Sequence, residues 1–209
     1  MDNNLIRLFN DKEMIKRIQV KMPILIQQAD IENSRGGSIG MEVGFDRERI
    51  IIALLMYYFG EQYVDTNIPT NEAEIDVKLF DNPISIKTIS NNSFSGVKLN
   101  WTVDQAKANE FSSNYKPNYD MLFLKISWER EGGFYYLPVK AQMDIYSSLD
   151  RFYLKLPKPG TNPRGGEISS MALKLVCNHR DSILIPINWQ KQNITFNQFT
   201  RWIDLWAQD

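Results

Sequence analysis

Asp76 and Lys87 are the two residues whose types and spacing point to chemistry. They lie in the segments EIDVKLF and PISIKT, in which apolar and polar residues alternate on either side of a short polar turn. Alternation with a period of two predicts a β-hairpin that carries both residues on its polar face. We expect the turn to be centred on residues 81–82, which makes Asp76 the cross-strand partner of Lys87, with Cβ atoms about 5 Å apart. The same register pairs Leu79 with Ile84.

A carboxylate beside an ammonium group suits the hydrolysis of a phosphodiester bond. A divalent cation bound by Asp76 polarises a phosphoryl oxygen and lowers the pKa of a bound water. Lys87 orients that water and stabilises the developing negative charge. The alternative is an exposed cross-strand salt bridge, which stabilises a sheet by only ~0.2–1 kcal/mol. Taken alone, the two residues are better explained as a salt bridge. Only the surrounding sequence can distinguish a catalytic pair from a salt bridge.

The rest of the chain supplies the elements that must position this hairpin. Helical spacing of apolar residues predicts helices over residues 5–22, 45–59, 102–112, 140–149, 169–177 and 197–207. Further strands are predicted over residues 120–128, 134–138 and 182–189. Thr102 and Gln105 have the capping-box spacing, which favours Thr102 as the start of its helix. The last helix carries Phe199, Trp202, Ile203 and Trp206 at helical spacing, which indicates the core or a subunit interface rather than a base-stacking surface.

The composition limits the class of protein. A chain of 209 residues that is 43% hydrophobic and 12% aromatic buries one sizeable core, so we expect a single domain over residues 1–209. Its net charge of −1 argues against coating nucleic acid through overall positive charge. A specific DNA partner requires basic residues gathered on one face.

Several segments argue against other classes of protein. The single cysteine, Cys177, forms no intramolecular disulfide, and no signal-peptide core opens the chain, so we expect a cytoplasmic protein. The apolar run at residues 50–59 is about half of the roughly 20 residues that cross a membrane, and indicates a buried helix. The loop ENSRGGSIGMEVG lacks the Lys-Ser/Thr ending of a P-loop, so no nucleotide cofactor is expected. The single histidine, His179, cannot form a two-histidine metal site and is interpreted as structural.

In this context the sequence resembles the PD-(D/E)XK nuclease superfamily, and type II restriction endonucleases in particular. The resemblance rests on Asp76 in EIDVKL, Lys87 in PISIKT, the helix at 102–112 and the strand YDMLFLKIS, and it covers about residues 45–128. In that family the aspartate binds metal on the first strand of a hairpin, the lysine lies on the second, and a helix and another strand complete the core. The resemblance therefore implies an α/β fold with a central mixed β-sheet flanked by helices, and Mg²⁺ as the cofactor.

One position departs from the family pattern. The family usually has Asp or Glu two residues before the lysine, where this chain has Ser85. Some restriction enzymes with a Ser-x-Lys arrangement recover the carboxylate from the following helix, which here offers Asp104 and Glu110. Asp104 at a helix start is also explained by the helix dipole. Glu74, one pleat from Asp76 on the same face, is a comparable metal ligand.

Family enzymes often add an acidic residue from the helix before the hairpin, and Glu48 fits that place, with Glu42 as the second choice. A solvated charge at a helix N-terminus explains Glu48 equally well. The candidate catalytic residues are therefore Asp76, Lys87, Ser85 and Glu48, and the candidate metal ligands are Asp76, Asp104 and Glu74.

The basic loop LKLPKPGTNPRGGEIS contains side chains that suit DNA recognition. Arg164 could donate two hydrogen bonds to guanine and Asn162 could pair with adenine, while Lys155 and Lys158 could hold phosphates. An ordinary surface loop explains the same composition. Arg35, in the glycine-containing loop, is a second candidate contact.

The resemblance and these residues together predict a restriction endonuclease that cuts both strands of double-stranded DNA at a short specific site. The resemblance and the two-fold symmetry of duplex sites imply a homodimer, and a methyltransferase gene beside this one would favour a role in restriction–modification. The catalytic core is expected at about residues 45–128, and the DNA-contacting and C-terminal elements at about 140–209. The alternatives are a repair or junction-resolving nuclease, a catalytically inactive DNA-binding module that Ser85 would explain, and a small-molecule hydrolase.

Overall fold

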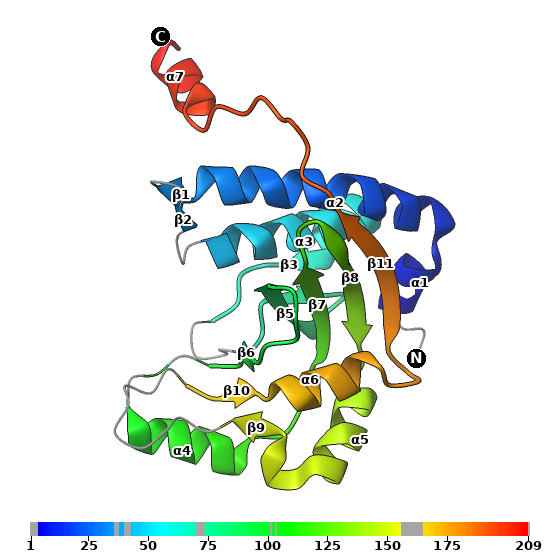
Figure 1. The fold of residues 1–209 in the computed structure, drawn as a ribbon. Helices are drawn as coiled ribbons and strands as arrows, with labels where there is room; N and C mark the ends of the chain where they lie inside the picture. The colour runs from blue at the N-terminus through cyan, green and yellow to red at the C-terminus, as the bar shows by residue number, and fades with distance from the viewer. Residues whose placement is uncertain are drawn as a thin grey trace.

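A six-stranded mixed β-sheet forms the centre of the protein, with the strand order β11-β8-β7-β5-β4-β3 (Figure 1). In chain order its strands are β3 (Val64–Asp65), β4 (Val77–Leu79), β5 (Asn82–Ser90), β7 (Asp120–Ile126), β8 (Arg130–Leu137) and β11 (Ile183–Trp189). Strands β5 and β7 are parallel, and the other neighbouring pairs are antiparallel. This computed structural model describes residues 4–35, 38–39, 43–69, 74–100, 102, 104–155 and 165–208, and at residues 35, 38 and 39 only the backbone. The expected α/β fold with a central mixed sheet is confirmed.

Strand β7 is buried on both faces because apolar residues occupy consecutive positions in MLFLKI rather than alternate ones. Leu122 and Leu124 belong to one hydrophobic core, and Met121 and Phe123 belong to a second core on the opposite face. Helices therefore have to cover both faces of the sheet.

Helices α1 (Asn4–Asn10), α2 (Lys12–Glu32) and α3 (Val43–Phe59) pack on the first core. On the other side lie α4 (Gln105–Asn114), α5 (Val139–Leu149) and α6 (Ser170–Cys177), together with a three-stranded sheet in the order β6-β10-β9 (Figure 1). That sheet consists of β6 (Val97–Lys98), β9 (Leu154–Lys155) and β10 (Glu167–Ile168), and the shorter elements are β1 (Ser34–Arg35), β2 (Ser38–Ile39), η1 (Glu61–Tyr63) and η2 (Asp150–Phe152). No helix among the described residues is long and apolar enough to span a membrane.

Three helix predictions differ from the structure. The first helical segment continues to Glu32 as α2, although Pro23 lies inside it. The helix predicted from residue 102 begins at Gln105, because the Asp104 side chain rather than Thr102 accepts the free backbone N–H groups. The last helix, α7 (Thr200–Trp206), has no buried residue, so the prediction that it could belong to the core is wrong. An interface remains its alternative explanation.

A buried ion pair fixes α3 against α2. Arg47 donates from Nη2 and Nε to Asp30 Oδ1 at 2.6 and 3.2 Å, and the two side chains are 7% and 9% exposed. The indole Nε1 of Trp128 donates to the other oxygen of Asp30 at 3.2 Å. Because Arg47 directly precedes Glu48, this network sets the position of a candidate catalytic carboxylate.

We expect Arg47→Met to lower the free energy of unfolding by about 3–5 kcal/mol, because it leaves Asp30 as a buried charge without its partner. Urea unfolding followed by circular dichroism measures the loss. Arg49→Ala is the matched control, since the Arg49 side chain is 78% exposed in its pair with Asp46 and such pairs contribute less than about 1 kcal/mol. Equal losses in the two variants would contradict the structural role given to the buried pair.

Candidate active site

The predicted hairpin with Asp76 and Lys87 forms, but its register is shifted. Val77 pairs with Ile84 and Leu79 pairs with Asn82, so the predicted pairing of Leu79 with Ile84 is wrong. The turn consists of Phe80 and Asp81, whose φ angles of 47° and 62° are both positive, as a two-residue type I′ hairpin turn requires. A shift by two residues along one strand keeps every side chain on its face of the sheet.

Asp76 consequently does not lie directly opposite Lys87, yet the two side chains meet. Lys87 Nζ donates to Asp76 Oδ2 at 2.9 Å, and both side chains are 15% exposed. The backbone N–H of Asp76 donates to the Ile84 carbonyl at 3.0 Å, although Ile84 is already the partner of Val77. Two residues thus oppose one, as in a β-bulge, which redirects a side chain at a strand end. The pair reaches diagonally across the hairpin.

Oδ2 of Asp76 accepts two further hydrogen bonds from β5. The backbone N–H of Ile86 donates to it at 2.5 Å, and the Ser85 hydroxyl donates at 3.3 Å. Among the described residues, no hydrogen bond to Asp76 uses Oδ1. Ser85, which is 5% exposed, therefore supports the Asp76 carboxylate from the position where the family usually has an acid.

Two half-buried glutamates surround this pair. Burial, together with the nearby negative charge of Asp76, raises the pKa of Glu48 to about 7 against the opposing effects of Lys87 and Arg49. Burial also raises the pKa of Glu74 to about 6, against the opposing effect of Lys87. Both carboxyl groups therefore lie within electrostatic range of Lys87. Three carboxyl groups around one ammonium form a site that is negatively charged once they are ionised.

Two tyrosines near Glu74 were missed by the sequence analysis. Tyr115 and Tyr153 are buried, and desolvation followed by neighbouring charges, including that of Glu74, raises the pKa of each phenol above its usual range. The Tyr153 hydroxyl has no hydrogen-bond partner among the described residues. Tyr153 follows η2, far along the chain from the hairpin, so no local sequence pattern indicates that it lies near Glu74.

Asp104 has a clear structural role. Its carboxylate caps α4 by accepting hydrogen bonds from the N–H groups of Ala106 and Lys107 at 2.8 and 3.2 Å, and the residue is exposed. In the described part of the chain, the one group of three acidic, histidine or cysteine side chains with ligand atoms within 4.8 Å of one another is Asp144, His179 and Asp181. Asp104 as a metal ligand thus stays a prediction, now with a competing explanation.

We interpret the group of Asp144, His179 and Asp181 as structural. His179 Nε2 lies 3.4 Å from Asp144, and its Nδ1 accepts from the backbone N–H of Asp181 at 3.2 Å. Lys140 already neutralises Asp181 through an ion pair of 2.5 Å. The histidine joins α5 to the segment after α6, which agrees with its structural interpretation.

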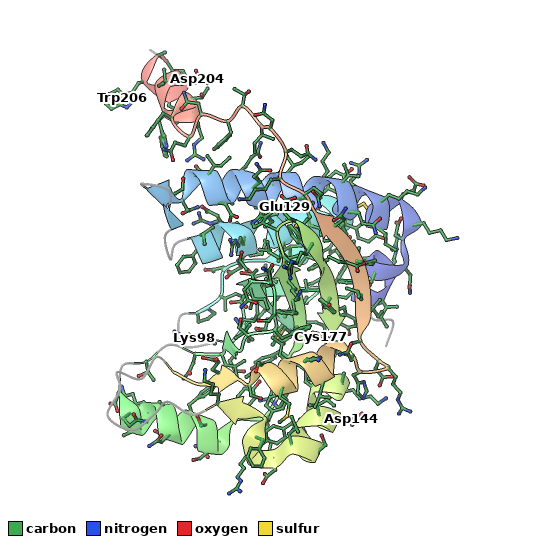
Figure 2. The ribbon with its side chains drawn as sticks, viewed as in Figure 1. Lys98, Glu129, Asp144, Cys177, Asp204 and Trp206 are labelled. Atoms are coloured by element: carbon green, nitrogen blue, oxygen red, sulfur yellow. The ribbon has the colours of Figure 1, made fainter. Side chains whose placement is uncertain are left out.

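The predicted DNA contacts are only partly described. Lys155 is exposed on β9, where its Nζ lies 3.2 Å from Glu167 on β10. On the other side of β10, Lys98 on β6 is the register partner of Glu167 in the sheet. Figure 2 shows Lys98 at the edge of the small sheet. Lys98 lies outside the proline- and glycine-containing loop. Arg35 is described only by its backbone in β1, and Lys158, Asn162 and Arg164 lie outside the described residues.

The comparisons with known proteins identify the class of this fold and site. A solved structure described as "Restriction endonuclease in complex with substrate DNA" superposes with a TM-score of 0.91 at 48% sequence identity, and the match covers 98% of this chain and 99% of the other. The protein is thus a restriction endonuclease by class, a DNA phosphodiester hydrolase. The family model described as restriction endonuclease ThaI matches residues 8–208, so the chain belongs to the restriction endonuclease ThaI family. A search of curated proteins found no match. The resemblance to restriction endonucleases is confirmed.

The site geometry predicts which carboxylate matters more. We expect Glu74→Gln to lower the cleavage rate by about 10²-fold or more, the scale of losing one preorganised charged group. Asp104→Asn should leave the rate within a few-fold, because asparagine caps a helix as well as aspartate does. Single-turnover cleavage rates at saturating metal measure both effects. A large loss in Asp104→Asn with little change in Glu74→Gln would instead assign the missing ligand to α4.

Proposed function

We propose that this restriction endonuclease hydrolyses phosphodiester bonds in both strands of double-stranded DNA at a short specific site, as a Mg²⁺-dependent homodimer. The observation that carries the proposal is the Asp76–Lys87 pair at 2.9 Å, with Glu48 and Glu74 in electrostatic range. An isolated surface salt bridge would not have two half-buried carboxyl groups around it. Their burial is unfavourable for the free protein, which supports a functional role.

The donor set fits a hard divalent cation. Mg²⁺ binds oxygen ligands and commonly uses one or two carboxylates, and the oxygens offered here belong to Asp76 and Glu74, with Asp104, the N-cap of α4, as the alternative to Glu74. A bound cation would oppose the burial that raises the pKa values of Glu48 and Glu74, because a positive charge favours their ionised form. The cation, when bound, would polarise a phosphoryl oxygen and lower the pKa of a water.

Side chains and a backbone N–H group of this chain stabilise charge, accept a proton and orient Asp76. Lys87 carries a positive charge that stabilises the negative charge that develops on the phosphate. Its hydrogen bond to Asp76 holds it in place before DNA arrives. Glu48, with its pKa near 7, is suited to accept a proton from the attacking water. Ser85 and the Ile86 N–H group orient the Asp76 carboxylate.

DNA recognition is proposed for the basic loop and its surroundings. The related structure is described as bound to substrate DNA, which supports duplex DNA as the partner here. Lys155 and Lys158 would contact phosphates, while Arg164 and Asn162 would read base edges. Arg35 is a further proposed contact. Contacts on each half of a symmetric site require two copies of the chain, which is why we propose a homodimer.

Incubation of the protein with phage DNA and Mg²⁺ tests the proposal. Discrete bands are expected, whereas a smear would indicate a nuclease without site specificity. Ca²⁺ should support binding without cleavage, since it takes oxygen ligands and activates water poorly. Full cleavage in the presence of EDTA would contradict the requirement for metal. The Lys87→Met variant serves as the control for contaminating nucleases.

A further inference from the structure

Helix α7 exposes a row of large apolar side chains. Phe199, Trp202, Ile203 and Trp206 follow one another at positions i, i+3, i+4 and i+7, and they are 58%, 51%, 59% and 91% exposed. Residues 190–197, which form neither helix nor strand, carry α7 away from the body of the protein (Figure 1). Trp206 points outward from α7 in Figure 2. Leaving such a row in water is unfavourable, so α7 has the character of one half of an interface.

An apolar groove between α2 and α3 could accept such a row of apolar side chains. It encloses a volume of about 300 Å³. Apolar side chains from both helices form its walls, including Ile18, Met22, Leu25, Ile50 and Leu54. Arg17 and Lys21 also line it, and the Arg17 guanidinium lies over the ring of Tyr57 at 5.2 Å. Leu25 and Tyr57 are 41% and 62% exposed, so α7 of the same chain does not close the groove.

We propose that α7 of a second copy of this chain docks into the α2–α3 groove, and that the exchange is reciprocal in a two-fold dimer. Helices that bind grooves present anchors at i, i+3, i+4 and i+7, which is the spacing on α7. Each aromatic anchor offers about 150–250 Å² for burial. In a two-fold dimer every contact occurs twice. The proposal rests on the homodimer of the proposed function and names the surface that forms it.

The charged residues of α7 lie on the face opposite its apolar row. Arg201 and Asp204 are two and five residues after Phe199, whereas the apolar residues are three, four and seven residues after it, and positions two and five fall on the other side of a helix. Figure 2 shows Asp204 on α7 well away from the body of the chain. The apolar row can therefore enter the apolar groove while both charged side chains stay in water.

The way in which residues 190–197 are attached favours docking of α7 on a second copy over docking in the groove of its own chain. Gln27 Nε2 donates to the Gln192 carbonyl at 2.8 Å, and the Gln192 N–H donates to Gln27 Oε1 at 2.9 Å. These two hydrogen bonds hold the base of the segment on α2, and beyond them the segment leads away from the body of the protein to α7 (Figure 1). The groove and α7 therefore remain open together in one chain, as expected when each is filled by the partner.

Cysteine cross-linking distinguishes the two arrangements. The double variant Leu25→Cys, Trp206→Cys should form a disulfide between chains on mild oxidation, which gives a band of dimer mass on a non-reducing gel. Cys177 should not interfere, because it is buried and burial raises the pKa of its thiol well above the usual range. The matched control is Leu184→Cys, Trp206→Cys, in which the exposed Leu184 on β11 lies outside the groove. A disulfide within one chain, or equal cross-linking in the control, would overturn the proposal.

Mass measurement by light scattering provides the second test. Trp202→Ala with Trp206→Ala should shift the full-length protein from dimer to monomer by at least 10-fold in dissociation constant, with an unchanged thermal unfolding midpoint of the monomer. A monomeric wild-type protein, or a double tryptophan variant that stays dimeric, would refute the exchange. Because these readouts involve no DNA cleavage, their failure is distinguishable from failure of the nuclease assignment.

Discussion

Replacing Lys87 by methionine is expected to lower the cleavage rate by about 10²–10³-fold, the cost of removing one preorganised donor from a developing negative charge. Methionine keeps most of the volume of the lysine side chain, which is 15% exposed, so the fold should be retained. Asp76→Asn should have an equally large effect, because an amide neither attracts a cation nor pairs with Lys87. Single-turnover rates on a cleavable duplex, with and without Mg²⁺, measure both losses.

The choice of substitution follows from the hydrogen bonds of Asp76. Its Oδ2 accepts from Lys87, Ile86 and Ser85, so alanine would leave these donors without a partner and lower stability as well as activity. Asparagine retains an oxygen at this place. Lys78→Met, on the neighbouring strand β4, is the matched control for loss of a lysine from the hairpin. If Lys87→Met kept more than about a tenth of the wild-type rate while Lys78→Met did the same, the pair would be only a salt bridge.

The hairpin shows which features of the candidate site can be predicted from the sequence and which cannot. Alternating residues correctly indicated two strands and the face on which Asp76 and Lys87 lie, since a strand has a fixed period of two. They did not indicate the register, because Phe80 and Asp81 adopt positive φ angles that neither residue type requires. The bulge at Asp76 was also not predictable, since it depends on a backbone hydrogen bond to Ile84. Asp76 and Lys87 still lie close together on one face despite the wrong register, because a shift by two residues keeps each side chain on its face.

The surroundings of the pair depend on long-range packing and were less predictable. Glu48 was named from the family pattern, but its burial depends on α3 packing beside the hairpin, which the Asp30–Arg47 pair helps to fix. The helix cap at Asp104 was assigned to Thr102, because both residues favour helix starts. Tyr153 lies far from Glu74 in the sequence and gave no local signal. Periodicity describes single elements, whereas such contacts arise between elements.

Cleavage is expected to depend on pH through Glu48. Burial, followed by the charge of Asp76, raises the pKa of Glu48 to about 7, with Lys87 and Arg49 opposing. Below that pH the carboxyl group is neutral and neither accepts a proton nor attracts a cation, so the rate should rise as pH increases through about 7. More Mg²⁺ should move this rise to lower pH, because a cation favours the ionised form. Rates measured across pH at two Mg²⁺ concentrations test the shift.

Glu48→Gln separates this effect from general pH sensitivity. Because the pKa of Glu48 is higher in the folded than in the unfolded protein, the folded state binds its proton more tightly. The resulting stabilisation is present below the unfolded pKa and is lost as pH rises through about 7. In EDTA, Glu48→Gln should therefore unfold at a higher temperature than wild type at about pH 8, with a smaller difference at about pH 5. The same variant should cleave slowly and lose the rise in rate near pH 7. A variant that is less stable than wild type at about pH 8, or that keeps this rise, would show that Glu48 is not the titrating group.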